Sequence, residues 1–159
     1  MTAPRSARLL VCSLLGAAAR VAVGVLWLVE GTLKYRAGFG AADIELVAQS
    51  AQGNTRVPDF FAPIGAAMSS ASAFFGAAVP ALEVGLGVLL VSGLLTRMAA
   101  FVSVGTLALY WSADQLITQY PLMVVLSAMV LLVVASGRFG VDGAIRARRA
   151  RRPVEGPGV

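Results

Sequence analysis

The chain has 159 residues, of which 58% are hydrophobic and 13% are charged, and its mean hydropathy is +0.80. A soluble domain is about half apolar and about a quarter charged, so this chain has too few polar residues to cover a globule in water. The composition therefore excludes an ordinary soluble domain and predicts an integral membrane protein.

Rare residue types limit the chemistry that the chain can perform. There is no His and one cysteine, Cys12. An internal disulfide, an imidazole base and a His-ligated haem or zinc site are therefore excluded. We expect no metal site, and any proton chemistry would rest on carboxylates, Tyr or Lys. We interpret Cys12 as a small apolar residue of a membrane helix.

Four apolar segments approach the ~20 helical residues that cross the ~30 Å hydrocarbon core of a bilayer. They are residues 9–33, 74–95, 98–117 and 121–136. We therefore predict an all-α fold, a four-helix transmembrane bundle with a long external loop after the first helix. The loop should contain a short surface helix that ends at Gly53 and an irregular aromatic segment around Phe60. The membrane domain would cover residues 1–148, followed by a basic, disordered tail over residues 149–159.

Positive charges predict the orientation of this bundle. The net charge is +5, and nine Arg residues flank the spans on one side, against three Lys or Arg residues on the other. The positive-inside rule then places both termini in the cytoplasm and the protein in the cell membrane. The cluster from Arg146 to Arg152 follows the last span, where this rule or attraction to anionic lipid explains it better than nucleic-acid binding.

An alternative interpretation takes the N-terminus as a cleaved signal peptide. Arg5 and Arg8 would form its basic region, residues 9–19 its apolar region and residues 17–19 its cleavage site. Cleavage would leave nine apolar residues before Glu30, too few to span a membrane, so we favour an uncleaved first span. N-terminal sequencing of the mature protein would decide between the two.

Polar residues inside the predicted spans are the candidate site. One stripe of the first helix carries, at intervals of three and four residues, Gly16, Arg20, Gly24, Trp27, Gly31 and Lys34. Glycines let a second backbone approach closely. Arg20 should therefore face a neighbouring helix and not lipid, where a charge is costly.

Glu83 is the only charged residue of the second span. It shares a small-residue face with Pro80 and Gly87, and Gly85 lies on an opposite small-residue face that should pack as well. At 1.5 Å per residue, Arg20 and Glu83 lie about 18 and 21 Å from the Arg residues at the cytoplasmic ends of their helices. Opposite charges at similar depth predict an ion pair, which either fixes the helix register or handles a ligand or proton.

The third span has a polar stripe of its own, made of Ser103, Thr106, Tyr110 and Asp114. Tyr110 lies about 20 Å from the cytoplasmic end, level with Glu83. Asp114 is near the external end, in range of Lys34 or Arg56, and we favour its interpretation as an interfacial residue in contact with water. Glu30 and Lys34 are four residues apart and should pair along their helix.

An external aromatic belt should be formed by Trp27, Trp111 and Tyr120. Together the stripes predict a polar patch in the outer half of the bundle, which suits a flat amphipathic head group such as a quinone and equally suits helix adhesion. No catalytic residue can be named. The candidate ligand-binding residues are Arg20, Trp27, Lys34, Glu83, Tyr110 and Asp114.

Three stretches of the chain resemble the DoxX/DoxD-like family of integral membrane proteins. Residues 20–34 are similar to the first helix of the family, through Arg20, Gly24, Gly31 and Lys34. Residues 82–100 are similar to its second-helix motif, through Glu83, Gly85 or Gly87, Gly93, Thr96 and Arg97. Residues 136–148 resemble the C-terminal motif of one branch of the family, through Gly137, Arg138, Gly140 and Asp142. That branch includes the membrane subunit of thiosulfate:quinone oxidoreductase.

The resemblance implies a four-helix membrane subunit of a redox complex, attached to quinone-linked oxidation of sulfur compounds or to an oxidative-stress assembly. It implies quinone as a cofactor that is not covalently bound. Because the chain has no second Cys to build a redox centre, electrons would come through a partner subunit or a docked soluble oxidoreductase. Lipid is a partner by composition, nucleic acid is not expected, and a homo-oligomer is left open.

Two other functions are alternatives to this hypothesis. A small-solute or proton-coupled transporter would use Glu83 as the titrating group, because carboxylates inside membranes mark ion pathways. Four helices without a visible inverted repeat disfavour this function. A purely structural membrane anchor would use the predicted pair of Arg20 and Glu83 for stability alone.

Overall fold

The structure is a computed structural model that describes residues 5–133 and 135–151. Within these residues it contains seven α-helices and no strand, which confirms the all-α class. The helices are α1 (Arg5–Ala37), α2 (Ala41–Ala51), α3 (Phe61–Ser70), α4 (Ser72–Ser92), α5 (Thr96–Ser112), α6 (Tyr120–Leu132) and α7 (Val141–Ala150). Most of the predicted tail, residues 152–159, lies outside the described residues.

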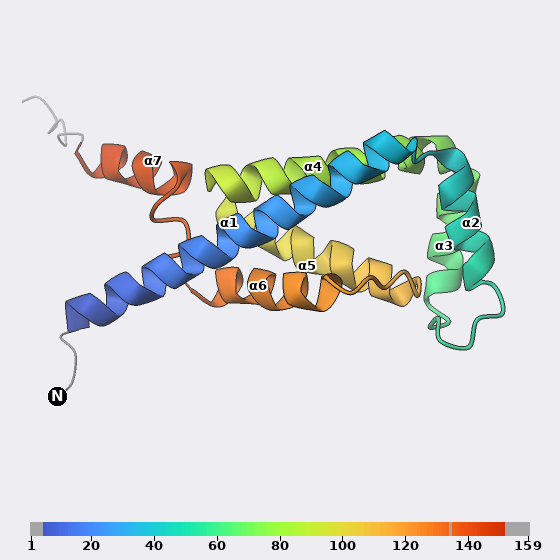
Figure 1. Cartoon of the computed structure of the whole chain (residues 1–159), viewed down its shortest axis with the longest axis horizontal. Helices are drawn as coiled ribbons and strands as arrows, with labels where there is room; N and C mark the ends of the chain where they lie inside the picture. Colours follow the sequence, from blue (N-terminus) through green and yellow to red (C-terminus); the bar gives the residue numbers. More distant parts are fainter. Residues whose placement is uncertain (1–4, 134, 152–159) are drawn as a thin grey trace, which may run out of the picture.

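The helices divide into a body that runs along the molecule and shorter helices at its two ends (Figure 1). Helices α1, α4, α5 and α6 form the body, in which α1 packs mainly on α4, and α5 on α6. Helices α2 and α3 lie across one end, and α7 lies at the other end, the end at which α1 begins (Figure 1). The predicted surface helix before Gly53 is therefore present as α2, and the aromatic segment around Phe60 leads into α3.

The lengths of the body helices differ from one another. Two of them, α1 and α4, are long and apolar enough to cross a membrane, and α6 is a shorter apolar helix. The predicted third and fourth spans correspond to α5 with 17 residues and α6 with 13. At 1.5 Å per residue, α6 is about 20 Å long, less than the ~30 Å hydrocarbon core. The four-span bundle therefore stays a prediction.

Glycines bring the backbones of α1 and α4 into contact. A Cβ atom at Gly31 would lie 2.9 Å from the backbone nitrogen of Val84, and one at Gly87 would lie 2.8 Å from the carbonyl oxygen of Gly24. These distances are shorter than van der Waals contact, so only glycine fits at both positions. The expectation that the face with Gly85 also packs is wrong, because a Cβ atom there would meet nothing within 4 Å.

The core of the body surrounds Trp27, which is 0% exposed. Its indole N–H donates to Ser103 Oγ at 2.7 Å, and Ser103 shares a hydrogen bond of 2.8 Å with Ser127. The predicted aromatic belt is therefore wrong for Trp27 and also for Tyr120, which is buried. Trp111, at 68% exposed, is compatible with a belt. Both buried rings satisfy their polar atoms inside the bundle or pack against other aromatic side chains.

The short turn between α4 and α5 is held from both sides. Arg20 donates to the carbonyls of Leu90 and Val91 at 2.6 and 3.1 Å, which places a cation at the C-terminus of α4. The carboxylate of Asp142 accepts the amides of Leu95 and Thr96 at 3.0 and 2.9 Å, which places an anion at the N-terminus of α5. Each charge is opposite in sign to the partial charge of the helix end that it contacts, so both contacts are stabilising. This clamp also ties the beginning of α7 to the body.

The Asp142 half of the clamp is predicted to be pH-dependent. Partial burial raises the pKa of Asp142, but the Thr96 and Leu95 amides and Arg146 lower it by more, so the net pKa lies below the ordinary value. Stability from this carboxylate is then complete above the ordinary Asp pKa of about 3.9 and is lost as pH falls through the lower folded-state pKa.

The variant Asp142→Asn should lower the thermal midpoint at neutral pH by about 2–4 °C, the effect of losing ~1 kcal/mol in a chain of this size. The difference from the wild type should shrink as the pH falls from the ordinary Asp pKa through the lower pKa of the folded carboxyl. Thermal unfolding in detergent between pH 3 and 7 measures it, with the exposed Asp59→Asn as the control. An equal effect of both variants, or one that grows on acidification, would contradict the clamp.

Candidate ligand-binding site

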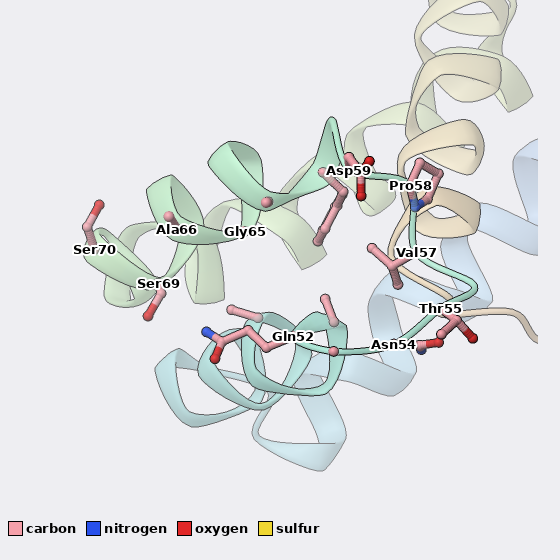
Figure 2. Close-up of a pocket in the computed structure, with 15 residues that line it drawn as sticks. Gln52, Asn54, Thr55, Val57, Pro58, Asp59, Gly65, Ala66, Ser69 and Ser70 are labelled. Atoms are coloured by element: carbon pink, nitrogen blue, oxygen red, sulfur yellow. The ribbon is translucent and has the colours of Figure 1, made fainter.

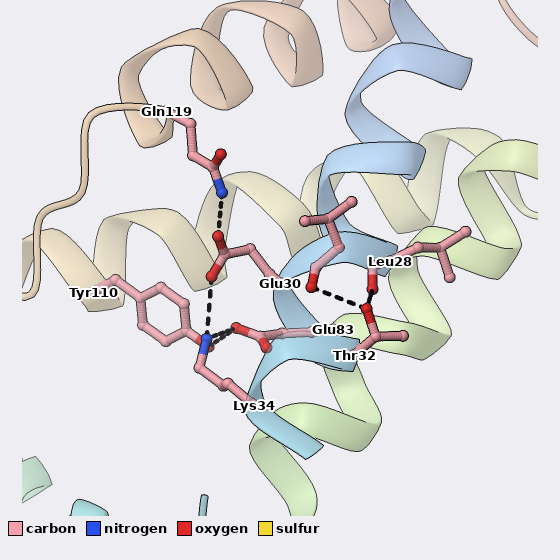
Figure 3. A network of polar contacts seen from close by, with 8 residues as sticks. Leu28, Glu30, Thr32, Lys34, Glu83, Tyr110 and Gln119 are labelled. Carbon is pink, nitrogen blue, oxygen red and sulfur yellow. Dashed lines mark hydrogen bonds and ion pairs between the residues drawn. The ribbon is translucent and has the colours of Figure 1, made fainter. Parts of the chain in front are cut away.

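A buried carboxylate on α4 lies at the centre of the site (Figure 3). Glu83 is 0% exposed, and its Oε1 atom accepts two hydrogen bonds of 2.7 Å, one from Lys34 Nζ and one from the hydroxyl of Tyr110. Three helices meet here, because Lys34 ends the long stripe of α1 and Tyr110 lies in the last turns of α5. The prediction that Tyr110 is level with Glu83 is confirmed.

A second carboxylate extends this network toward α6. Lys34 Nζ lies 3.4 Å from Glu30 Oε2, which confirms the predicted pair along α1, and Gln119 donates its side-chain amide to the other oxygen of Glu30 (Figure 3). We call Glu30, Lys34, Glu83, Tyr110 and Gln119 the Glu83 network. It holds two carboxylates and one ammonium group, and Glu83 Oε2 has no hydrogen-bond partner among the described residues.

The predicted ion pair between Arg20 and Glu83 is wrong. Arg20 contacts the carbonyls of Leu90 and Val91, and Glu83 lies seven residues before Leu90, about 10 Å away along the helix. The prediction measured depth from Arg residues at the ends of the two helices and so assumed that both ends are level. In the structure the beginning of α1 extends past the end of α4 (Figure 1). Lys34, two stripe positions after Trp27, is the cation that pairs with Glu83 in place of Arg20.

A cavity of about 650 Å³ adjoins the Glu83 network. Residues of α1, α4, α5 and α6 line it, and residues of α2 and α3, the helices across one end of the molecule (Figure 1), complete the lining. We call it the inner cavity. Its walls are mainly apolar, and its polar lining residues are Glu30, Lys34, Thr106, Tyr110, Asp114, Gln115 and Tyr120.

The structure brings three of the predicted site residues together at the inner cavity, since Lys34, Tyr110 and Asp114 line it. Glu83 bonds to Lys34 and Tyr110, and the ring of Trp27 packs edge-on against Tyr110 in the core. Arg20 alone lies apart, at the end of α4. Glu30, Tyr120 and Gln119 were missed as site residues. Glu30 had a detectable signal, its spacing of four from Lys34. For Gln119 the sequence offered none, because it precedes a helix and carries no charge.

Asp114 occupies an unusual backbone conformation at the rim of the inner cavity. Its φ of 54° lies in the left-handed region, which Asp tolerates better than most residues. The carboxylate accepts a hydrogen bond of 3.0 Å from the side chain of Asn54 and lies 3.4 Å from Arg56 Nε. Of the two cations expected to be in range, Arg56 is the one that Asp114 contacts, and Asp114 joins the α5–α6 connection to the loop after α2.

These features define a helical protein of membrane type with a buried charged network beside a mainly apolar cavity. Comparison with known families agrees with that class, because the DoxX family model matches residues 15–113. The match covers more than half of the chain, and the chain belongs to the DoxX family. It does not reach residues 136–148, so the thiosulfate:quinone oxidoreductase branch stays a prediction. Searches of curated proteins and of solved structures gave no significant match.

Proposed function

We propose that this DoxX-family protein is a four-span subunit of a redox complex in the cell membrane that binds a quinone head group in the inner cavity. A partner subunit or soluble oxidoreductase would exchange electrons with that quinone. Both termini would lie in the cytoplasm. The beginning of α1 and the whole of α7 lie at one end of the molecule, which supports this orientation (Figure 1).

The observation that carries the proposal is the combination of apolar walls and a few convergent polar groups. A volume of about 650 Å³ is within the ~300–1,000 Å³ typical of small-molecule sites. Lys34 has three N–H donors, and Glu30 and Glu83 accept two of them. The third donor is available for a quinone carbonyl. The ring of Tyr110, whose centroid is 5.6 Å from Lys34 Nζ, supplies an aromatic wall for a flat head group.

The position of the inner cavity also suits a ligand that arrives through lipid. Its lining includes Leu82 on α4, which is 42% exposed, and the exposed Leu116 and Ile117 after α5. These residues form an apolar rim on the outside of the body. An isoprenoid tail could leave the cavity there and remain in the hydrocarbon phase while the head group contacts Lys34.

Removing the polar groups of the site should weaken quinone binding. Lys34→Met with Glu83→Gln removes both charges so that neither is left buried alone, and Tyr110→Phe removes the hydroxyl that donates to Glu83. We expect the double variant to raise the Kd for a short-chain quinone about tenfold, the loss of one charge-assisted hydrogen bond of ~1.4 kcal/mol. Titration of purified protein in nanodiscs measures the Kd.

The matched controls are Tyr35→Phe and Arg36→Met, which remove a phenol hydroxyl and a positive charge on the exposed side of α1. They should leave the Kd unchanged. Wild-type protein that neither retains nor binds quinone, together with unchanged quinone reduction in a strain lacking the gene, would refute the proposal. Transport of a solute in proteoliposomes that disappears in Glu83→Gln would instead favour the transporter.

A further inference from the structure

A second cavity lies at the end of the molecule, between α2, α3 and the loop that joins them (Figure 2). Its volume is about 830 Å³, and we call it the outer pocket. It differs from the inner cavity in chemistry, because small residues and uncharged polar side chains form most of its lining. Gln52, Asn54, Thr55, Ser69 and Ser70 supply amide and hydroxyl groups, and Asp59 is its one charged lining residue.

One aromatic side chain belongs to the linings of both cavities. Phe61, at the beginning of α3, lines both the outer pocket and the inner cavity, and it is the only described residue to do so. It is 1% exposed, so its side chain is packed closely among its neighbours. Nothing bulky supports the ring from the next turn of α3, since that position is Gly65 and a Cβ there would lie 3.3 Å from Phe61 Cε1.

A polar contact also links the linings of the two cavities. Asn54 lines the outer pocket, Asp114 lines the inner cavity, and the two side chains share the hydrogen bond of 3.0 Å described above. Polar side chains as well as Phe61 therefore connect the linings of the two cavities. Lys34 and Tyr110 also line the inner cavity.

We propose that the outer pocket binds a small hydrophilic solute, uncharged or cationic, and that a partition formed by Phe61, Asn54 and Asp114 admits this solute to the inner cavity. The chain then has a compartment for a water-borne reactant and one for a lipid-borne ligand, with one side chain common to both linings. Asp59 favours a cation, and no Lys or Arg lines the pocket to hold an anion. The inference rests on the proposed function only for the occupant of the inner cavity.

Cysteine accessibility tests this path without any quinone, so its failure is distinguishable from failure of the proposed function. The chain has one cysteine, which Cys12→Ser removes. Ala113→Cys then reports on the inner cavity and Ala66→Cys on the outer pocket. The probes are methanethiosulfonate reagents of fixed charge, one cationic and one anionic, which do not cross lipid. Intact mass measured over time on protein in nanodiscs gives the rates.

We expect Ala66→Cys to react quickly and Ala113→Cys more slowly, with the cationic reagent faster at both. Adding Phe61→Leu should raise the rate at Ala113→Cys about tenfold, which corresponds to lowering a barrier by ~1.4 kcal/mol. Adding Gly65→Ala should lower that rate, because its methyl group confines the ring. Neither change should alter the rate at Ala66→Cys by a comparable factor.

The proposal is overturned if Phe61→Leu and Gly65→Ala leave the rate at Ala113→Cys unchanged, or if the anionic reagent is the faster one. Thermal unfolding checks that each variant is folded. If Phe61→Leu does not fold, Gly65→Ala decides alone, since it adds one methyl group in a helix and removes no packing.

Discussion

A double-mutant cycle between Lys34 and Glu83 is expected to give a coupling free energy of about 1–3 kcal/mol, whereas a cycle between Arg20 and Glu83 should give less than ~0.5 kcal/mol. The first pair is joined at 2.7 Å around a fully buried carboxylate. The second pair contacts different partners, and Arg20 acts on the end of α4.

The single variant Lys34→Met should have the largest effect on folding of any substitution in the site. It leaves Glu83 buried with only the hydroxyl of Tyr110 as a partner, and an uncompensated buried charge costs about 3–5 kcal/mol. Glu83→Gln should cost less, because Lys34 keeps Glu30 as a partner at 3.4 Å. The double variant should lose less free energy of unfolding than the two single variants lose together.

Denaturant unfolding in detergent micelles measures both cycles. Arg36→Met replaces Lys34→Met as the matched control, since Arg36 is exposed in the last turn of α1. We expect its coupling to Glu83→Gln to be close to zero. A strong coupling of Arg20 with Glu83, or rescue by exchanging their charges, would show that the site is assembled differently.

The second large effect is expected where α1 and α4 touch. Gly31→Ala and Gly87→Ala should each destabilise the protein by about 1–3 kcal/mol, the usual result of overpacking a close contact. The added methyl groups would lie within 3 Å of backbone atoms of the neighbouring helix, and backbone cannot move aside as a flexible side chain can. Separation of the two helices would also lengthen the contact between Lys34 and Glu83.

Gly85→Ala is the matched control, because it lies in the same helix as Gly87 and its Cβ would meet nothing within 4 Å. This variant should be neutral or more stable by up to ~1 kcal/mol, since Ala is the better helix former. The measurements are thermal unfolding and the quinone Kd. Equal effects of Gly85→Ala and Gly87→Ala would mean that another chain covers the face with Gly85.

Local patterns predicted those parts of the site that lie on a single helix. The pair of Glu30 and Lys34 follows from a spacing of four residues, and the close approach of α1 and α4 follows from glycines at intervals of three and four. The inward position of Trp27 could also have been recognised, because it lies on the same stripe as Gly24 and Gly31. Its assignment to a lipid-facing belt ignored that signal.

Relations between helices were predicted less well. Counting residues from the Arg at each helix end gave Tyr110 the right level but gave Arg20 the wrong one, since α1 begins far beyond the end of α4 (Figure 1). The missing quantity was the stagger between helices, which depends on side-chain packing and has no period in the sequence. Phe61, Asn54 and Gln119 were missed for a related reason, because they lie in or beside loops.

The sequence by itself determined the class of this protein. A chain with this apolar excess lies in lipid, where helices satisfy the hydrogen bonds of the backbone, and its polar residues recur at helical spacing. The sequence also determined which faces of α1 and α4 meet, since only glycine permits that approach. Only the tertiary structure decided which charge accompanies Glu83 and where the cavities lie. Both depend on how far one helix slides along another, and a shift of a few ångströms there exchanges the partners of every buried polar group.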